Sequence, residues 1–233
     1  MENYPKPVTK ETHKKISEYL DNSIYQIKVD EDKYGIGFFC SLKCHNKKAI
    51  VLITNYQIIN ENYLKNHEYV DILMNQKSIR VVFNLIYYLD KQLDLSVIEI
   101  KENKKIKILE LDDDIYRKES ETYFNKESIY IIDNNCVSYS IINNITKYEF
   151  AFKCHLRNHS HFSPIFNLAT NKLIGIYKKD FIYYHKGIFF RYIIMLLESK
   201  YLKKDMEDNL YNEIEISINF DNKDINNKIY FFR

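Results

Sequence analysis

Short apolar runs, each bounded by polar or turn residues, dominate the chain from residue 23 onward. The first half contains these runs at Ser23–Val29, Tyr34–Leu42, Lys48–Thr54, Tyr69–Met74, Lys77–Phe83 and Leu93–Ile100. Each run has the length of a strand, and the runs follow one another without long helical stretches between them. Short strands at this close spacing predict an antiparallel barrel rather than alternating strand–helix units.

The second half repeats this pattern after a charged stretch, Lys101–Lys126. Its runs lie at Ser128–Ile132, Val137–Asn143, Tyr148–Cys154, Pro164–Leu168, Leu173–Tyr177, Phe181–Tyr184 and Ile188–Phe190. We interpret the charged stretch as the crossing between two lobes. Its acidic run Asp112–Asp114 lacks the spaced ligands and the glycine of a calcium loop, so we expect a solvated linker there.

Helical spacing occurs near the two ends of the chain. Thr9–Asp21 carries Ile16, Tyr19 and Leu20 on one side, which predicts an amphipathic helix capped by Thr9 or Thr12. Arg191–Lys203 predicts a second helix, and Glu213–Phe220 with Lys228–Phe232 predicts an added hairpin. The sequence therefore predicts an all-β fold of two antiparallel barrels, with a short N-terminal helix and a C-terminal helix plus hairpin. The expected domain ranges are 1–22, 23–108, 109–200 and 201–233.

Composition narrows the function classes only slightly. Hydrophobic residues make up 45% and charged residues 28% of the 233 positions, and the formal charge of +2 gives no reason to expect nucleic-acid or membrane binding. The start of the sequence has no apolar signal core and no stretch reaches the length of a membrane span, so we expect a cytoplasmic protein. The cysteines lack zinc-like pairing, so we expect free thiols at Cys40, Cys44, Cys136 and Cys154. We expect no cofactor for the chain.

The stretch from Asn158 to Lys178 predicts a tight loop ending at Pro164, followed by a two-stranded hairpin. It resembles the nucleophile loop of the trypsin-like serine peptidases, Gly-x-Ser-Gly-Gly-Pro followed by a hairpin that ends in Gly-Ile. Anchored on Pro164, the resemblance places the serine of the family at His161. The glycines of the family fall on His159, Phe162 and Ser163.

Three other stretches resemble the same family, in the order of the family. Tyr34–Cys40 resembles the Gly-x-Gly-Phe strand that opens the first barrel. Val51–Ile59 is similar to the strand end that carries the histidine base, with Gln57 in place of that histidine. Leu93–Ile100 resembles the strand that carries the acid of the triad, and Asp94 is retained. The resemblance spans about Lys10 to Leu197 and is closest to members without a signal peptide from protists and some large viruses.

The triad-equivalent positions Gln57, Asp94 and His161 lack the chemistry of the family. Acyl transfer in this family needs a hydroxyl nucleophile, an imidazole base and a carboxylate that orients the imidazole. The side-chain amide of Gln57 can donate to Asp94 but has no basicity at neutral pH. His159 and Phe162 place bulky side chains where the oxyanion loop has glycine. The resemblance therefore implies a catalytically inactive homologue that binds a protein or peptide partner.

Two hydrolase alternatives use the same segment. Cys154, His155, His159 and His161 contain good zinc ligands, although their spacing matches no common zinc signature. Alternatively, a register slip would make Ser160 the nucleophile, with a neighbouring histidine as its base. These would make the chain a metal-dependent hydrolase or an active serine endopeptidase.

Two further readings concern binding surfaces. The chain could be a structural component of an assembly through its predicted C-terminal hairpin; the sequence leaves the oligomeric state open. The adjacent rings at Phe38–Phe39 and at Phe189–Phe190 are expected as barrel core with one ring facing out, rather than as a platform for stacking bases.

Overall fold

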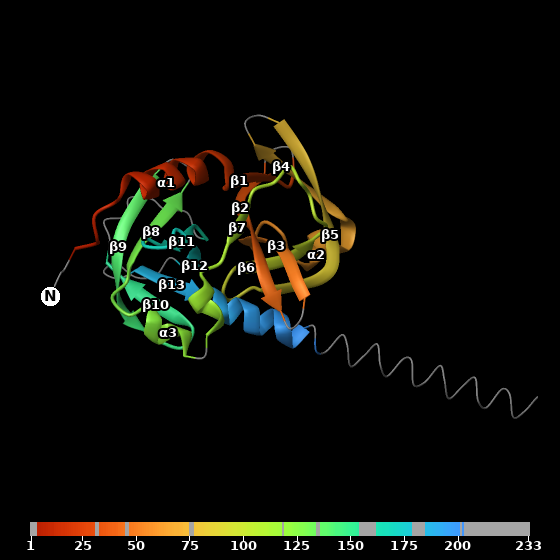
Figure 1. Cartoon of the computed structure of the whole chain (residues 1–233). Helices are drawn as coiled ribbons and strands as arrows, with labels where there is room; N and C mark the ends of the chain where they lie inside the picture. Colours follow the sequence, from red (N-terminus) through yellow and green to blue (C-terminus); the bar gives the residue numbers. More distant parts are fainter. Residues whose placement is uncertain are drawn as a thin grey trace, which may run out of the picture.

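The computed structural model describes residues 4–30, 33–44, 47–74, 77–117, 119–133, 136–153, 162–178, 185–200 and 202. Two β units lie side by side in it (Figure 1). The first is a seven-stranded sheet in the order β1-β4-β5-β6-β3-β2-β7. Its strands are β1 Tyr25–Lys28, β2 Tyr34–Cys44, β3 Lys47–Asn55, β4 Tyr69–Met74, β5 Lys77–Asp90, β6 Leu95–Ile100 and β7 Ile108–Glu110. Because β1 pairs with β2 as well as with β4, β1 to β6 form a ring and β7 lies outside it.

The second unit is a closed barrel in the order β10-β13-β12-β11-β8-β9. Its strands are β8 Ser128–Asp133, β9 Cys136–Ile145, β10 Glu149–Phe152, β11 Pro164–Asn167, β12 Leu173–Lys178 and β13 His185–Phe189. All pairings within it are antiparallel. The predicted strand Phe181–Tyr184 and the predicted C-terminal hairpin lie outside the described residues.

The N-terminal helix α1 (Lys10–Asn22) joins the two units. Its N-cap is Thr9, whose side chain accepts from the N–H of Thr12. Thr9 was one of the two residues predicted as the cap. Tyr19 of α1 stacks on Phe166 of the second barrel with ring centroids 5.1 Å apart. The next elements are short: α2 (Glu61–Asn66), the 3-10 helix η1 (Asp113–Tyr116) and α3 (Ser120–Tyr123). The predicted C-terminal helix is present over 190–200.

The alternation of side chains between the two faces of β2 explains how the units are joined. Phe38 and Phe39 point to opposite faces of the strand, yet they are only 1% and 0% exposed. Phe39 packs inside the first sheet, whereas Phe38 packs against the second barrel, where it meets the ring of Phe190 at 6.3 Å. The expectation that one ring of each phenylalanine pair faces out is wrong. The other unit covers the outer face of β2, and Phe189 and Phe190 are also buried, at 2% and 0% exposed.

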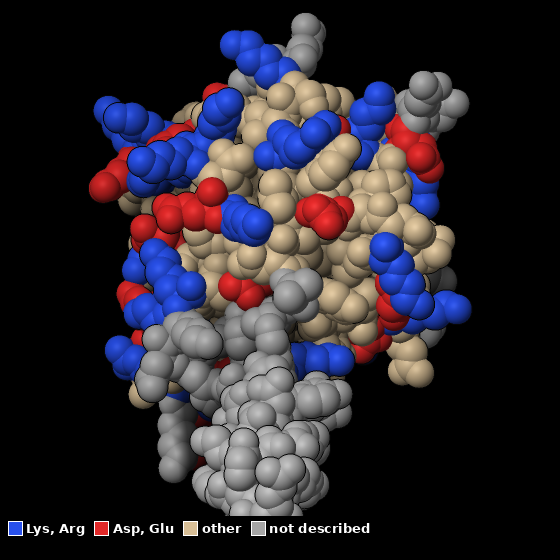
Figure 2. All heavy atoms as spheres, turned by 90° about the vertical axis from the view of Figure 1, so that its right-hand side faces the viewer, with Lys and Arg blue, Asp and Glu red and all other residues tan. Residues whose placement is uncertain are grey.

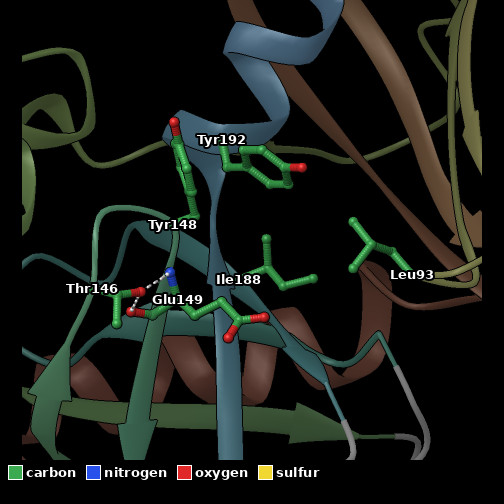
Figure 3. Close-up of a pocket in the computed structure, with 6 residues that line it drawn as sticks. All are labelled: Leu93, Thr146, Tyr148, Glu149, Ile188 and Tyr192. Carbon is green, nitrogen blue, oxygen red and sulfur yellow. Dashed lines mark hydrogen bonds between the residues drawn. The ribbon is translucent and has the colours of Figure 1, made fainter.

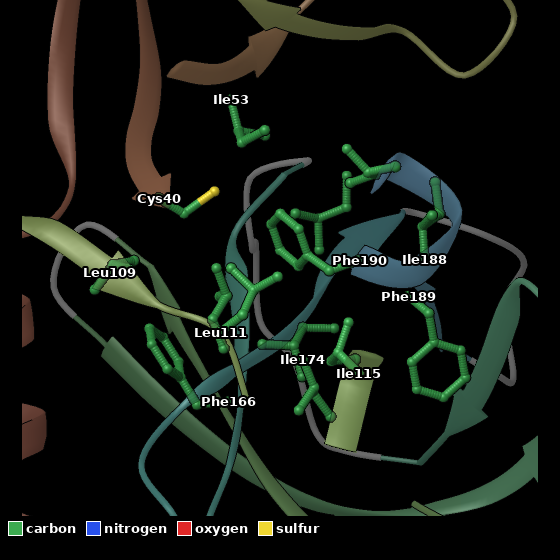
Figure 4. Close-up of a cluster of buried hydrophobic side chains, with 14 of the residues drawn as sticks. Cys40, Ile53, Leu109, Leu111, Ile115, Phe166, Ile174, Ile188, Phe189 and Phe190 are labelled. Atoms are coloured by element: carbon green, nitrogen blue, oxygen red, sulfur yellow. The ribbon is translucent and has the colours of Figure 1, made fainter. Parts of the chain in front are cut away.

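The shared core is continuous from one unit to the other. Figure 4 shows Cys40 and Ile53 of the first sheet facing the buried side chains Ile174 and Phe190 of the second unit. Burial of apolar surface is the dominant favourable term in protein packing, so this shared core stabilises the contact between the units.

Two of the glycines are required by close packing. A Cβ at Gly187 would overlap the ring of Phe150, and a Cβ at Gly175 would lie 2.5 Å from the carbonyl oxygen of Ile188. Neither glycine has a positive φ. The ring of Phe150 therefore lies over two neighbouring strands that cannot carry side chains at these positions.

The crossing between the units differs from the expected solvated linker. Asp112 is only 2% exposed. Its Oδ2 accepts from Thr170 Oγ1 at 2.6 Å and from Asn167 Nδ2 at 3.2 Å, and its Oδ1 accepts from the N–H of Asp114. Satisfied buried acceptors of this kind fix backbone position. The expectation is wrong for Asp112, which joins the crossing to the β11–β12 turn.

On the face over the first sheet, basic and acidic side chains are interspersed with uncharged ones (Figure 2). Within the part of the chain that the structure describes, no helix is long and apolar enough to cross a membrane. The expected lack of nucleic-acid partners and the expected cytoplasmic location stay predictions.

Candidate functional site

The turn between β5 and β6 positions Asp94. The carboxylate of Asp90 accepts the N–H groups of Gln92 at 2.9 Å and Leu93 at 2.8 Å, and it accepts the hydroxyl of Tyr88 at 2.9 Å. An aspartate that accepts N–H groups two and three residues ahead is a common way to fix a tight turn. Asp94 follows with a φ of 53°, a left-handed conformation that aspartate tolerates better than most residues.

Asp94 is in turn bonded to the end of β3. Its Oδ1 accepts from the backbone N–H of Gln57 at 3.0 Å, and its Oδ2 accepts from the side-chain Nδ2 of Asn55 at 3.0 Å. Its carbonyl oxygen accepts from the N–H of Tyr56 at 2.9 Å. Each carboxylate oxygen therefore has an amide donor, and the half-buried charge is held by neutral groups.

The structure thus brings Gln57 and Asp94 together, as the resemblance implies, but through a different atom. We expected the side-chain amide of Gln57 to donate to Asp94; the donor is its backbone N–H, and the Gln57 side chain is exposed. The side-chain donor is Asn55, which the sequence analysis missed. An amide residue at the strand end, two positions before Gln57, was the available signal.

Phe162, which the resemblance aligns with an oxyanion-loop glycine, has a φ of 74°. Its ring is only 3% exposed and belongs to the shared core. Its N–H donates to the carbonyl oxygen of Tyr177 at 2.9 Å, so this amide is turned toward β12. A backbone conformation that favours glycine is therefore occupied by a bulky, buried side chain.

The remaining predicted site residues lie outside the described residues. These are the nucleophile equivalent His161, the oxyanion-loop equivalent His159, the alternative nucleophile Ser160 and the additional metal-ligand candidates Cys154 and His155. Among the residues that are described, no group of three or more His, Cys, Asp or Glu side chains could hold a metal ion. The roles assigned to the residues outside the described ranges stay predictions.

Sequence comparisons assign no family: no protein-family model matches the chain, and no curated protein matches it. Among solved structures, the chain is similar to the Rv3671c protease in its inactive form, with a TM-score of 0.51 and 10% sequence identity. The match covers 80% of this chain and 91% of that chain. At this identity the likeness shows the fold alone. The predicted all-β, trypsin-like fold is confirmed.

Proposed function

We propose that this chain is a catalytically inactive homologue of the trypsin-like serine peptidases that acts as a protein- or peptide-binding module. The observation that carries the proposal is the environment of Asp94. Its two oxygens accept amide protons from Gln57 and Asn55. In an active triad the carboxylate orients an imidazole, whereas an amide cannot accept the proton of a nucleophile at neutral pH.

The bulk of Phe162 supports the same proposal. In the family, the glycines let the loop turn its N–H groups toward the developing charge. The resemblance places one of these glycines at Phe162, whose ring is buried and fills core space. Enzymes that lose the triad still accelerate the reaction about 10³–10⁴-fold over water, and this remaining acceleration depends on an intact oxyanion hole.

Peptide binding in this fold does not require the triad, because main-chain pairing and side-chain pockets act independently of it. The described strands of the second barrel form a closed ring, so none of these strands offers a free edge to which a peptide could be added. Recognition by a pocket at the junction of the units is the mode that the described residues favour.

The experiment is a casein-digestion assay on the purified full chain, run with and without a metal chelator and beside an active trypsin-like peptidase. We expect no turnover above buffer. Chelator-sensitive turnover would favour the metal-dependent hydrolase, and chelator-insensitive turnover would favour the active serine endopeptidase. Either result would reject the proposed inactivity.

A further inference from the structure

A small pocket of about 210 Å³ opens where the two units meet. Figure 3 shows its walls, with Leu93 on one side and the remaining side chains on the other. Its lining residues are Leu93, Thr146, Tyr148, Glu149, Ile188 and Tyr192. Leu93 comes from the β5–β6 turn and directly precedes Asp94, so the pocket adjoins the candidate site.

The walls of this pocket are held in place by their own contacts. Thr146 Oγ1 accepts from the N–H of Glu149 at 3.0 Å, and the N–H of Thr146 donates to the Glu149 carbonyl oxygen at 2.7 Å. The rings of Tyr148 and Tyr192 pack with centroids 4.6 Å apart. Ile188 at the base is only 1% exposed. The pocket is therefore formed before any ligand arrives, which lowers the entropic cost of binding.

The volume of the pocket limits what it can hold. Pockets for drug-sized molecules and cofactors occupy about 300–1,000 Å³. An apolar cavity of about 150 Å³ holds a benzene molecule. The pocket at Leu93 and Ile188, at about 210 Å³, therefore suits one side chain of leucine or phenylalanine size rather than a cofactor.

Lysines outnumber acids around the pocket. The carboxylate of Glu149 is paired with Lys178 at 3.2 Å and with Lys186 at 3.8 Å. Lys147 places its Nζ 5.2 Å from the centre of the Tyr148 ring. Glu149 is thus paired with two lysines and a third lies over the neighbouring Tyr148 ring, so the rim favours a negatively charged ligand.

A second acid, Asp90, lies near the pocket residue Tyr192. Burial and then the charge of Asp90 raise the pKa of Tyr192. The Asp90 carboxylate is bonded to the Tyr88 hydroxyl and to two N–H groups of its own turn. These donors engage the Asp90 carboxylate, so three lysines and two acids, Glu149 and Asp90, lie around the pocket.

We propose that this pocket binds one leucine-sized apolar side chain of a partner peptide whose adjacent residues are Asp or Glu. The apolar side chain lies against Leu93, Ile188 and the ring of Tyr148. The acidic neighbours contact the lysines around Glu149. This inference rests on the proposed peptide-binding function and names the side-chain chemistry that the partner must present.

The test uses the full chain with labelled Ile, Leu and Val methyl groups, titrated in an NMR experiment. The probe is a seven-residue Gly/Ser peptide with a central leucine flanked by Asp and Glu; matched peptides carry alanine in place of leucine or lysines in place of the acids. We expect saturable shifts at the methyls of Leu93 and Ile188 and none at Val70 and Ile72 inside the first sheet. Both matched peptides should bind about tenfold more weakly.

Variants separate the pocket from other modes of binding. Tyr148→Ala should weaken binding of the leucine peptide about tenfold, whereas Tyr123→Ala, which removes an exposed tyrosine that also lies under a cation, should not. Saturable shifts confined to other methyls would overturn the pocket while leaving peptide binding intact. Absence of saturation with the leucine peptide would also overturn it. Neither result bears on inactivity, which the digestion assay tests separately.

Discussion

The backbone N–H of Gln57 donates to Oδ1 of Asp94 at 3.0 Å, which joins the end of β3 to the start of β6. Asn55 completes this junction through Oδ2. The contacts give Asp94 a structural role that needs no imidazole at position 57. Under the proposed inactivity, this structural role is a reason for the chain to keep an acid at position 94.

Replacing Asp94 by alanine tests this structural role. Asp94→Ala leaves the N–H of Gln57 and the amide of Asn55 without their acceptor, and it places alanine at a φ of 53°. We expect a loss of about 1–3 kcal/mol in the free energy of unfolding, measured by chemical denaturation. Asp113→Ala, at an exposed carboxylate, is the control. An unfolding midpoint for Asp94→Ala equal to that of the wild type would show that the junction contributes nothing.

Introducing a histidine at position 57 tests whether Asp94 still lies where a triad acid must lie. The backbone nitrogen of residue 57 is 3.0 Å from the Asp94 carboxylate. An imidazole on residue 57 would therefore interact electrostatically with that carboxylate. A nearby negative charge favours the imidazolium, so the pKa of the new histidine should exceed the ordinary value of about 6.5. NMR titration of Gln57→His measures it. The elevation should disappear in Gln57→His with Asp94→Asn; equal pKa values in the two backgrounds would contradict the geometry.

The backbone at Phe162 predicts an unusual order of stability. Both Phe162→Ala and Phe162→Gly lose a buried ring, which costs about 3–5 kcal/mol. At a φ of 74° alanine also keeps a left-handed penalty of about 1–2 kcal/mol that glycine avoids. Phe162→Gly should therefore be at least as stable as Phe162→Ala in denaturant titrations.

Phe152 supplies the matched control for that comparison. It is 0% exposed in β10 and is not among the residues with positive φ. There Phe152→Ala should be more stable than Phe152→Gly by about 0.5–1 kcal/mol. The same order at both positions would show that the left-handed conformation of Phe162 carries no cost.

The burial of Tyr130 leads us to expect that the protein loses stability in alkali. Burial, followed by the charges of Tyr19 and Tyr139, raises the pKa of Tyr130 above the ordinary value of 10.0. The fold therefore favours the neutral phenol: its contribution to stability is complete below pH 10.0 and is lost as the pH rises toward the folded-state pKa. Unfolding measured between pH 8 and pH 12 should weaken less steeply in Tyr130→Phe than in the wild type. Tyr123→Phe, at an exposed tyrosine, should follow the wild type.

Strand positions could be predicted wherever apolar and polar residues alternate without interruption. The predicted strand Tyr69–Met74 coincides with β4. β5 extends to Asp90, beyond the predicted end at Phe83, because a register shift between Phe83 and Tyr87 interrupts the alternation. α2 was missed because none of its six residues is fully buried and only Tyr63 and Leu64 pack partly against the core, which is too short an apolar stripe to predict a helix.

Polar residues at the junctions were harder to predict. The acidic run at Asp112 has the composition of a solvated loop, and its burial depends on donors from Asn167 and Thr170, more than fifty residues away. Gln57 and Asp94 could be placed together because each belongs to a recognisable strand end. Asn55 could not, since its partner is set by the left-handed turn at Asp94. The first sheet also extends past the predicted boundary at residue 108, because β7 pairs with β2.

The most direct test of the proposed inactivity is labelling of the purified full chain with a fluorophosphonate, followed by mass spectrometry of the intact protein. This reagent reacts with a serine only when a base and an oxyanion hole activate it. We predict no adduct under conditions in which an active trypsin-like peptidase is labelled completely. One adduct per chain, located on Ser160 and abolished by Ser160→Ala, would contradict the account.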